Sequence, residues 1–358
     1  MADILMKGNE ALAEGALRAG CRFYAGYPIT PQNEILEYMS QKMPESGGTF
    51  IQGESEIASI SMVWGAAAAG ARAMTSSSGP GFSLKQEGIA YIASYGVPAV
   101  LVSVMRYGVG GGDITQGQDS YLQAVKGGGN GDYRLIVLSP VSVSDCAQFG
   151  YDAFDLAEKY RNPVLILSDG AIGQMVEPCK LPDAKEHDIN KHDWYIKGRP
   201  QCERMYKATN LNWYWGDKEW ERWVRDKYST IMENEQRWDS FETEDAEVIL
   251  VAFGVSARVC KKAVTVGRKQ GIKLGLIRPI TLWPYPRKAF TNFNSGLKGF
   301  LSVQMDITGQ MTEDILLADR FRHPVYTCST AIEIPRVENV IGKVTEILRG
   351  EAIPHEVL

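Results

Sequence analysis

The chain has 358 residues, of which 44% are hydrophobic and 23% are charged, and its formal net charge is −5 at pH 7. This composition is that of an ordinary globular protein, long enough for two domains. The acidic balance offers no basic field for nucleic acid or an anionic membrane, and no apolar run reaches the about 18–20 residues that a membrane span needs.

The N-terminal half alternates expected strands and helices. Residues 1–10 carry charges where a signal peptide would have its apolar core, so we expect a cytoplasmic protein. Short apolar runs that end in Gly, Pro or polar residues predict strands at 23–27, 49–52, 73–76, 99–105, 135–138 and 164–167. Apolar side chains that recur three or four residues apart predict helices at 8–18, 34–43, 57–69, 84–95 and 143–159. The repeated order predicts an α/β fold with a doubly wound parallel sheet.

Residues 183–244 differ from this pattern. They are rich in charge, Trp and Tyr, and only 220–234 shows the periodicity of a helix. We interpret the segment as a long linker that lies over a surface or a partner, with a separate small domain as the alternative.

A second α/β unit follows this segment. Strands are expected at 248–254, 274–277 and 300–304, with an edge strand at 325–326, and a helix is expected at 256–270. The predicted organisation is therefore an N-terminal domain at 1–182, a linker at 183–244 and a C-terminal domain at 245–358.

The six cysteines and four histidines show no metal-binding pattern. No two cysteines have the C-x-x-C spacing of a zinc site or of a cysteine-ligated cluster. We interpret them as small buried side chains in a reducing compartment: Cys21, Cys146, Cys179, Cys202, Cys260 and Cys328. The chain is expected to carry no metal of its own.

Two short segments point to chemistry. The Gly-Tyr-Pro-Ile-Thr-Pro turn at 26–31 follows an apolar strand and presents a hydroxyl between two prolines. Glu54 and Glu56 stand at the mouth of an apolar helix of small side chains, where a carboxylate shielded from water could share a proton with a heterocycle nitrogen. This arrangement suits the aminopyrimidine ring of thiamine diphosphate. Acids at a helix start are also favoured by the macrodipole alone, and the spacing leaves both glutamates open.

Arg106 ends the expected strand at 99–105, at the sheet edge where ligands of open α/β folds bind. Its guanidinium could grip the carboxylate of a 2-oxo acid with two hydrogen bonds, although an Arg at a strand end is often simply exposed. Thr30 could bind substrate or cofactor, or cap the following helix.

Glycine-rich stretches need a separate interpretation. The stretches at 108–112 and 127–131 lack the dinucleotide fingerprint, so they indicate a loop around a substrate pocket rather than NAD or FAD binding. The Gly-Pro-Gly at 79–81 lets backbone pass close to a flat group, or is simply a turn.

These residues together resemble the α subunit of the 2-oxoacid:ferredoxin oxidoreductases, most closely the branched-chain (2-oxoisovalerate) type. The resemblance covers nearly the whole chain and rests on the segments at 26–31, 55–56, 77–82, 104–106, 126–133 and 167–169. Residues 248–254 and 278–284 are similar to the transketolase carboxy-terminal domain.

The resemblance implies specific roles. Glu56 matches the glutamate that activates the cofactor, and Thr30 and Arg106 match residues near the substrate carboxylate. The expected cofactor-binding set is Glu56, Tyr27, Pro28, Ile29, Thr30, Gly79, Pro80 and Gly81. The family decarboxylates a 2-oxo acid on thiamine diphosphate, passes electrons through iron–sulfur clusters to ferredoxin and releases an acyl-CoA. The loop at 107–112 departs from the usual family pattern, which bears on the identity of the acid.

The sequence lacks the other half of such a site. The family holds diphosphate and Mg²⁺ with a Gly-Asp-Gly segment followed by an asparagine, and neither 112–114 nor 168–170 continues in that way. We therefore expect a β subunit to hold the diphosphate and Mg²⁺. A γ subunit and a ferredoxin-like subunit with the iron–sulfur clusters complete the expected assembly. The alternatives are a 2-oxoglutarate-specific α subunit, the β subunit of a lipoamide-linked 2-oxo acid dehydrogenase, and a noncatalytic scaffold.

Overall fold

The structure is a computed structural model that describes residues 3–108, 113–192, 194–196 and 217–355. Its larger sheet has seven strands in the order β12-β6-β7-β5-β4-β2-β3. All neighbours are parallel except β12, which runs antiparallel to β6. The strands are β2 (Phe23–Gly26), β3 (Thr49–Gln52), β4 (Ala73–Ser77), β5 (Val100–Met105), β6 (Ile136–Leu138), β7 (Val164–Asp169) and β12 (Thr281–Trp283). The α/β fold with a parallel sheet is confirmed.

Helices cover both faces of this sheet. The helices are α1 (Gly8–Arg18), α2 (Asn33–Glu45), α3 (Glu56–Ala68), α4 (Gly79–Leu84), α5 (Gln86–Ser94), α6 (Tyr121–Lys126), α7 (Val143–Tyr160) and α8 (Gly170–Gln174). The central strand β5 is buried on both sides because its successive side chains point to opposite faces. Val102 packs in the core with α1 and α7, and its neighbour Leu101 packs in the core with α3 and α5.

The second sheet has five strands in the order β14-β13-β10-β11-β9. These strands are β9 (Trp238–Phe241), β10 (Val248–Val251), β11 (Leu274–Pro279), β13 (Gly299–Gln304) and β14 (Val325–Ser329), and only β9 is antiparallel to its neighbour. Its helices are α11 (Gly254–Lys269), α12 (Thr312–Asp319) and α13 (Val337–Arg349). The edge position expected for 325–326 is confirmed.

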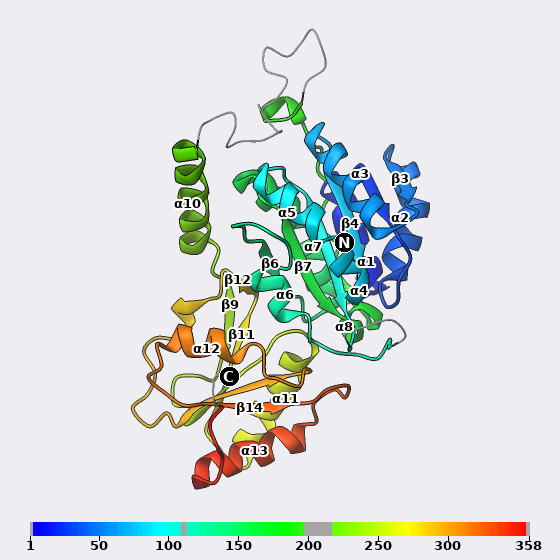
Figure 1. Ribbon diagram of the computed structural model, residues 1–358. Helices are drawn as coiled ribbons and strands as arrows, with labels where there is room; N and C mark the ends of the chain where they lie inside the picture. Colours follow the sequence, from blue (N-terminus) through cyan, green and yellow to red (C-terminus); the bar gives the residue numbers. More distant parts are fainter. Residues whose placement is uncertain (1–2, 109–112, 193, 197–216, 356–358) are drawn as a thin grey trace.

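The chain crosses between the two sheets more than once (Figure 1). Within the segment expected as a linker, α10 (Asp217–Asn234) contains the predicted helix, and β9 forms an edge of the five-stranded sheet. Later in the chain β12 returns to the seven-stranded sheet and pairs with β6. Neither β9 nor β12 was expected, because three or four residues are too few to show a period.

Asp169 joins the two halves at the end of β7. Its buried carboxylate accepts hydrogen bonds from the Val255 N–H at 2.8 Å, the Ile172 N–H at 3.0 Å and Gln118 Nε2 at 3.1 Å. Burial raises the pKa of Asp169, and these donors oppose that rise. Gly254 has a φ of +56°, and a Cβ there would collide with Asp169 Oδ2. The start of α11 is thus fixed against the carboxyl end of the larger sheet.

Three minor features complete the fold. β1 (Ile4–Lys7) pairs with β8 (Val176–Cys179) in a separate two-stranded sheet, and two 3₁₀ turns occupy Ile189–Lys191 and Arg287–Ala289. The five cysteines within the described residues are free, and Cys202 lies outside those residues. None of the described helices is both long and apolar enough to cross a membrane.

Candidate active site

Three adjacent strands bring the candidate residues to one edge of the seven-stranded sheet. β5, β4 and β2 are neighbours and run parallel, so their carboxyl ends meet at the same edge. β2 leads into the turn at 27–31, β4 leads into the segment at 78–81, and β5 leads into Arg106. This is the edge at which open α/β sheets bind ligands.

Glu56 is the first residue of α3, and its side chain is held away from solvent. Ser55 accepts a hydrogen bond from the Ala58 N–H at 3.2 Å, which fixes the residue at which the helix begins. Glu56 is only 6% exposed, whereas Glu54 is classed with the exposed residues. Of the two glutamates that the spacing left open, only Glu56 is buried.

Gly81 makes room for the Glu56 carboxylate. A Cβ on Gly81 would lie 3.0 Å from Glu56 Cδ, 2.5 Å from Ser77 Oγ and closer still to Glu56 Oε1. The hydroxyls of Ser77, Ser78 and Ser103 are buried and have no hydrogen-bond partner among the described residues. Buried polar groups are normally hydrogen-bonded, so these hydroxyls are available to a polar ligand.

Lys85 lies next to Glu56 and was not anticipated. Its side chain is fully buried, and Nζ donates to Thr75 Oγ1 at 2.9 Å and to the Glu56 carbonyl oxygen at 3.5 Å. Burial lowers the pKa of Lys85 to about 7, and the charge of Glu56 opposes this shift. A buried amine whose pKa lies near neutrality is therefore in contact with the backbone of Glu56. The sequence carried no signal for it, because lysines are rarely fully buried.

Arg106 is buried, like Glu56, and lies in contact with Thr30. Arg106 is 5% exposed, and its Nη1 donates to the Thr30 carbonyl oxygen at 3.1 Å, while Thr30 itself is exposed. Gly79 has a φ of +45°, and a Cβ there would lie 2.9 Å from Arg106 Nε. Because Gly79 contacts Arg106 and Gly81 contacts Glu56, the first turn of α4 lies between the two charged side chains.

The other predicted residues surround this turn. Tyr27 and Pro28 are exposed, Ile29 and Pro80 are half-buried, and Tyr27 lies beyond the end of β2. A cavity of about 420 Å³ opens beside Thr30. Of the glycine-rich loop expected to shape the pocket, residues 109–112 lie outside the described residues.

One group of potential metal ligands occurs among the described residues, and it includes none of the site residues. Glu158, His187 and His192 offer ligand atoms within 4.8 Å of one another. Both Glu158 oxygens already accept hydrogen bonds from Arg72, from Nε at 2.9 Å and from Nη2 at 2.5 Å. Within the described residues, therefore, no group of three potential metal ligands includes Glu56 or Arg106.

Comparisons with known families match both halves of the chain. Residues 14–219 match the family described as "Pyruvate flavodoxin/ferredoxin oxidoreductase, thiamine diP-bdg". Residues 246–332 match "Pyruvate:ferredoxin oxidoreductase core domain II". Glu56, Arg106 and the α4 turn all lie within the first match.

Individual relatives cover most of the chain. It is 45% identical to "Ketoisovalerate oxidoreductase subunit VorB" of Methanothermobacter marburgensis, over 97% of this chain and 98% of that protein. It is 35% identical to "2-oxoglutarate synthase subunit KorA" of the same organism, over 87% and 90%.

Two solved structures superimpose on this chain. A 2-oxoglutarate:ferredoxin oxidoreductase from Magnetococcus marinus superimposes with a TM-score of 0.85 at 26% identity, covering 97% of this chain and 65% of that longer chain. A split-gene transketolase superimposes with a TM-score of 0.59 at 12% identity, which shows a shared fold. The similarity expected to a transketolase carboxy-terminal fold agrees with this second superposition.

Proposed function

The chain belongs to the 2-oxoacid:ferredoxin oxidoreductase family, and we propose that it is the subunit that holds the aminopyrimidine ring of thiamine diphosphate against Glu56. The observation that carries the proposal is a buried carboxylate at a helix start, facing a glycine that leaves no room for a side chain. The assembled enzyme converts a 2-oxo acid and CoA to an acyl-CoA and CO₂, with electrons delivered to ferredoxin.

The residues around Glu56 fit the cofactor ring. A ring nitrogen that shares a proton with Glu56 would satisfy the buried carboxylate, and the unpartnered hydroxyl of Ser77, which lies at the same side of Gly81, would be available to another polar atom of the ring. Gly81 keeps the space beside the carboxylate open. Tyr27, Pro28, Ile29, Thr30, Gly79 and Pro80 complete the proposed cofactor-binding set.

When bound, thiamine diphosphate supplies the acidic carbon that adds to the oxo group and accepts the electrons left after CO₂ departs. Glu56 holds the proton shared with the ring, in a setting that excludes water. Lys85 supplies a second proton-exchanging group, since its pKa is lowered to about 7 by burial. Arg106 provides a guanidinium at the same sheet edge, and we assign it to the carboxylate of the 2-oxo acid. The Thr30 carbonyl oxygen orients that guanidinium.

The proposed substrate is a branched-chain 2-oxo acid, 3-methyl-2-oxobutanoate. Its support is the 45% identity to a ketoisovalerate oxidoreductase subunit along nearly the full length of both chains, against 35% to a 2-oxoglutarate synthase subunit. The 2-oxoglutarate-specific enzyme is the second candidate.

Partner subunits complete the site in this proposal. Among the described residues, Glu158, His187 and His192 are the one group of three or more potential ligands, and a hard cation such as Mg²⁺ prefers oxygen ligands together with phosphate. We therefore assign the diphosphate and Mg²⁺ to a β subunit and the iron–sulfur clusters to a γ subunit and a ferredoxin-like subunit. Ranges 1–182, 183–244 and 245–358 are our proposed domain, linker and second domain.

The test of the cofactor role is a matched pair of variants in the assembled enzyme. Glu56→Gln keeps the side-chain shape but removes the shared proton, and kcat should fall by about 10²- to 10⁴-fold with thiamine diphosphate present. Glu54→Gln, two residues earlier and exposed, should stay within about twofold of wild type, the scale expected for a surface change. Reduction of a viologen dye by a 2-oxo acid with CoA measures both. Equal activities of the two variants would refute the assignment of Glu56.

Substrate identity needs its own assay. The wild-type complex is supplied with 3-methyl-2-oxobutanoate, 2-oxoglutarate or pyruvate, and kcat/KM is compared. The branched-chain acid should give the highest value. A preference for 2-oxoglutarate would favour the 2-oxoglutarate-specific enzyme and would leave the proposed role of Glu56 unchanged. Turnover that depends on lipoamide and does not reduce ferredoxin would contradict both candidate enzymes.

A further inference from the structure

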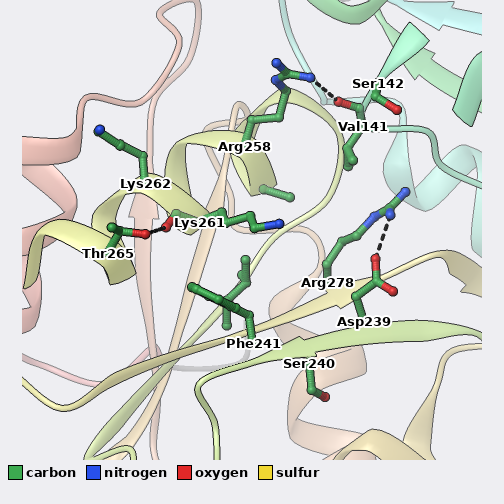
Figure 2. A pocket seen from close by; sticks show the side chains of 12 residues that line it. Val141, Ser142, Asp239, Ser240, Phe241, Arg258, Lys261, Lys262, Thr265 and Arg278 are labelled. Carbon is green, nitrogen blue, oxygen red and sulfur yellow. Dashed lines mark hydrogen bonds and ion pairs between the residues drawn. The ribbon is translucent and has the colours of Figure 1, made fainter. Parts of the chain in front are cut away.

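A pocket beside the five-stranded sheet shares no residue with the candidate active site. Its volume is about 770 Å³, which lies within the range of small-molecule sites in proteins. The pocket is bounded by α11, by the edge strand β9 with its neighbour β11, and by the loop that leads into α7 (Figure 2). It is therefore built where the two halves of the chain meet.

The charged lining of this pocket is mostly positive, and it consists of Arg258, Lys261, Lys262, Arg278 and Asp239. The two arginines are fixed by carboxylates. Arg258 donates to Glu177 at 2.6 Å, and Arg278 donates to Asp239 at 2.8 Å and to Asp145 at 2.5 Å. The positive charge of each arginine is therefore largely balanced by carboxylates of this chain.

The two lysines are different. Among the described residues, neither the Lys261 nor the Lys262 ammonium forms an ion pair. Lys261 Nζ lies 5.5 Å from the centroid of the Phe241 ring, and Figure 2 shows this side chain reaching across the pocket toward Arg278. The pocket therefore presents one positive charge over an aromatic ring, at Lys261, and a second at its rim, at Lys262, whose side chain points away from Arg278 in Figure 2.

The uncharged lining combines three hydroxyl side chains, Ser142, Ser240 and Thr265, with four apolar ones. Val141, Ala257 and Leu276 line it together with Phe241, whose ring offers a flat surface. A ligand that matches this lining has a planar apolar part for the ring and at least one multiply charged anionic group for the lysines. We propose that this pocket binds a nucleoside phosphate, with the base against Phe241 and the phosphates at Lys261 and Lys262. This site is independent of the proposed function, because it uses none of the residues assigned to the cofactor or the 2-oxo acid.

The experiment is a calorimetric titration of the assembled enzyme, loaded with thiamine diphosphate, using ADP, adenosine and inorganic pyrophosphate as probes. ADP should bind more tightly than either adenosine or pyrophosphate, since only ADP engages both parts of the pocket. The double variant Lys261→Met and Lys262→Met should weaken ADP binding at least tenfold. Lys269→Met removes an exposed lysine of the same helix that does not line the pocket, and it should leave ADP binding unchanged.

A second variant tests the aromatic part. Phe241→Leu keeps an apolar side chain on β9 and removes the flat ring, so it should weaken ADP binding while leaving pyrophosphate binding as in wild type. The melting temperature of each variant complex confirms that it is folded. The proposal is overturned by any of three results: no ADP binding to the wild-type complex, as when a partner subunit covers the pocket; the same Kd in the lysine double variant; or pyrophosphate binding as tightly as ADP.

Discussion

Gly81→Ala provides the sharpest test of the site geometry. Gly81 lies in α4 without a positive φ, so alanine is acceptable to the backbone and acts only through its added methyl group. That methyl group would lie 2.5 Å from Ser77 Oγ and closer still to Glu56 Oε1, whereas ordinary contact begins near 3.4 Å. The carboxylate must therefore move by about 1 Å, and a misplacement of that size in a catalytic group costs about 100-fold in rate.

The assay is turnover of the 2-oxo acid by the assembled enzyme, with kcat and melting temperature measured together. The expected result is a kcat lowered about 100-fold with the complex still folded. Gly342→Ala is the matched control: it lies in helix α13, has nothing within 4 Å of the added Cβ, and should leave kcat unchanged. Wild-type kcat in Gly81→Ala would show that the Glu56 carboxylate does not act from the position seen here.

Three stability predictions follow from buried charges, each measured by urea denaturation. Because burial lowers the pKa of Lys85 from 10.5 to about 7, the unfolded chain binds this proton more tightly, so stability rises as pH increases through that window. Lys85→Met should lose about 1.4 kcal/mol of that rise per pH unit, and an unchanged slope would contradict the burial argument. Asp169→Ala leaves three donors between the two halves without an acceptor and should lower the free energy of unfolding by about 3 kcal/mol or more; a loss below about 1 kcal/mol would refute this. Arg72→Met leaves the mostly buried Glu158 carboxylate without its arginine partner and should cost about 3–5 kcal/mol, and a loss near zero would contradict this.

The local parts of the site could be predicted from the sequence because their signals are local. The turn at 26–31, the Gly-Pro-Gly at 79–81 and Arg106 each follow a strand whose apolar run is visible in the chain. Parallel strands then place their carboxyl ends together without any knowledge of side-chain packing. The choice between Glu54 and Glu56 also had a local signal, since Ser55 as the helix cap makes Glu56 the first helical residue.

What the sequence missed depends on distant partners. Lys85 lies between α4 and α5, and its buried ammonium donates to Thr75 and to the first residue of α3, which are 10 and 29 residues away in the chain. Nothing in the residues around it distinguishes it from an exposed lysine. Gln118 donates to the Asp169 carboxylate and to the Phe253 carbonyl oxygen, 51 and 135 residues away in the chain. Such pairings have no period and no fixed spacing, so they become visible only once the two sheets are placed together.

The pairing of β12 with β6 has a consequence for how such a chain can be divided. Ser139 donates its N–H to the Ile280 carbonyl oxygen at 2.9 Å, so the second half supplies backbone hydrogen bonds to the first sheet. A piece that stopped before residue 245 would leave β6 as a bare edge, with unpaired amide groups inviting association with other chains. A gene split at this point would need both products made together, each acting as the other's folding partner.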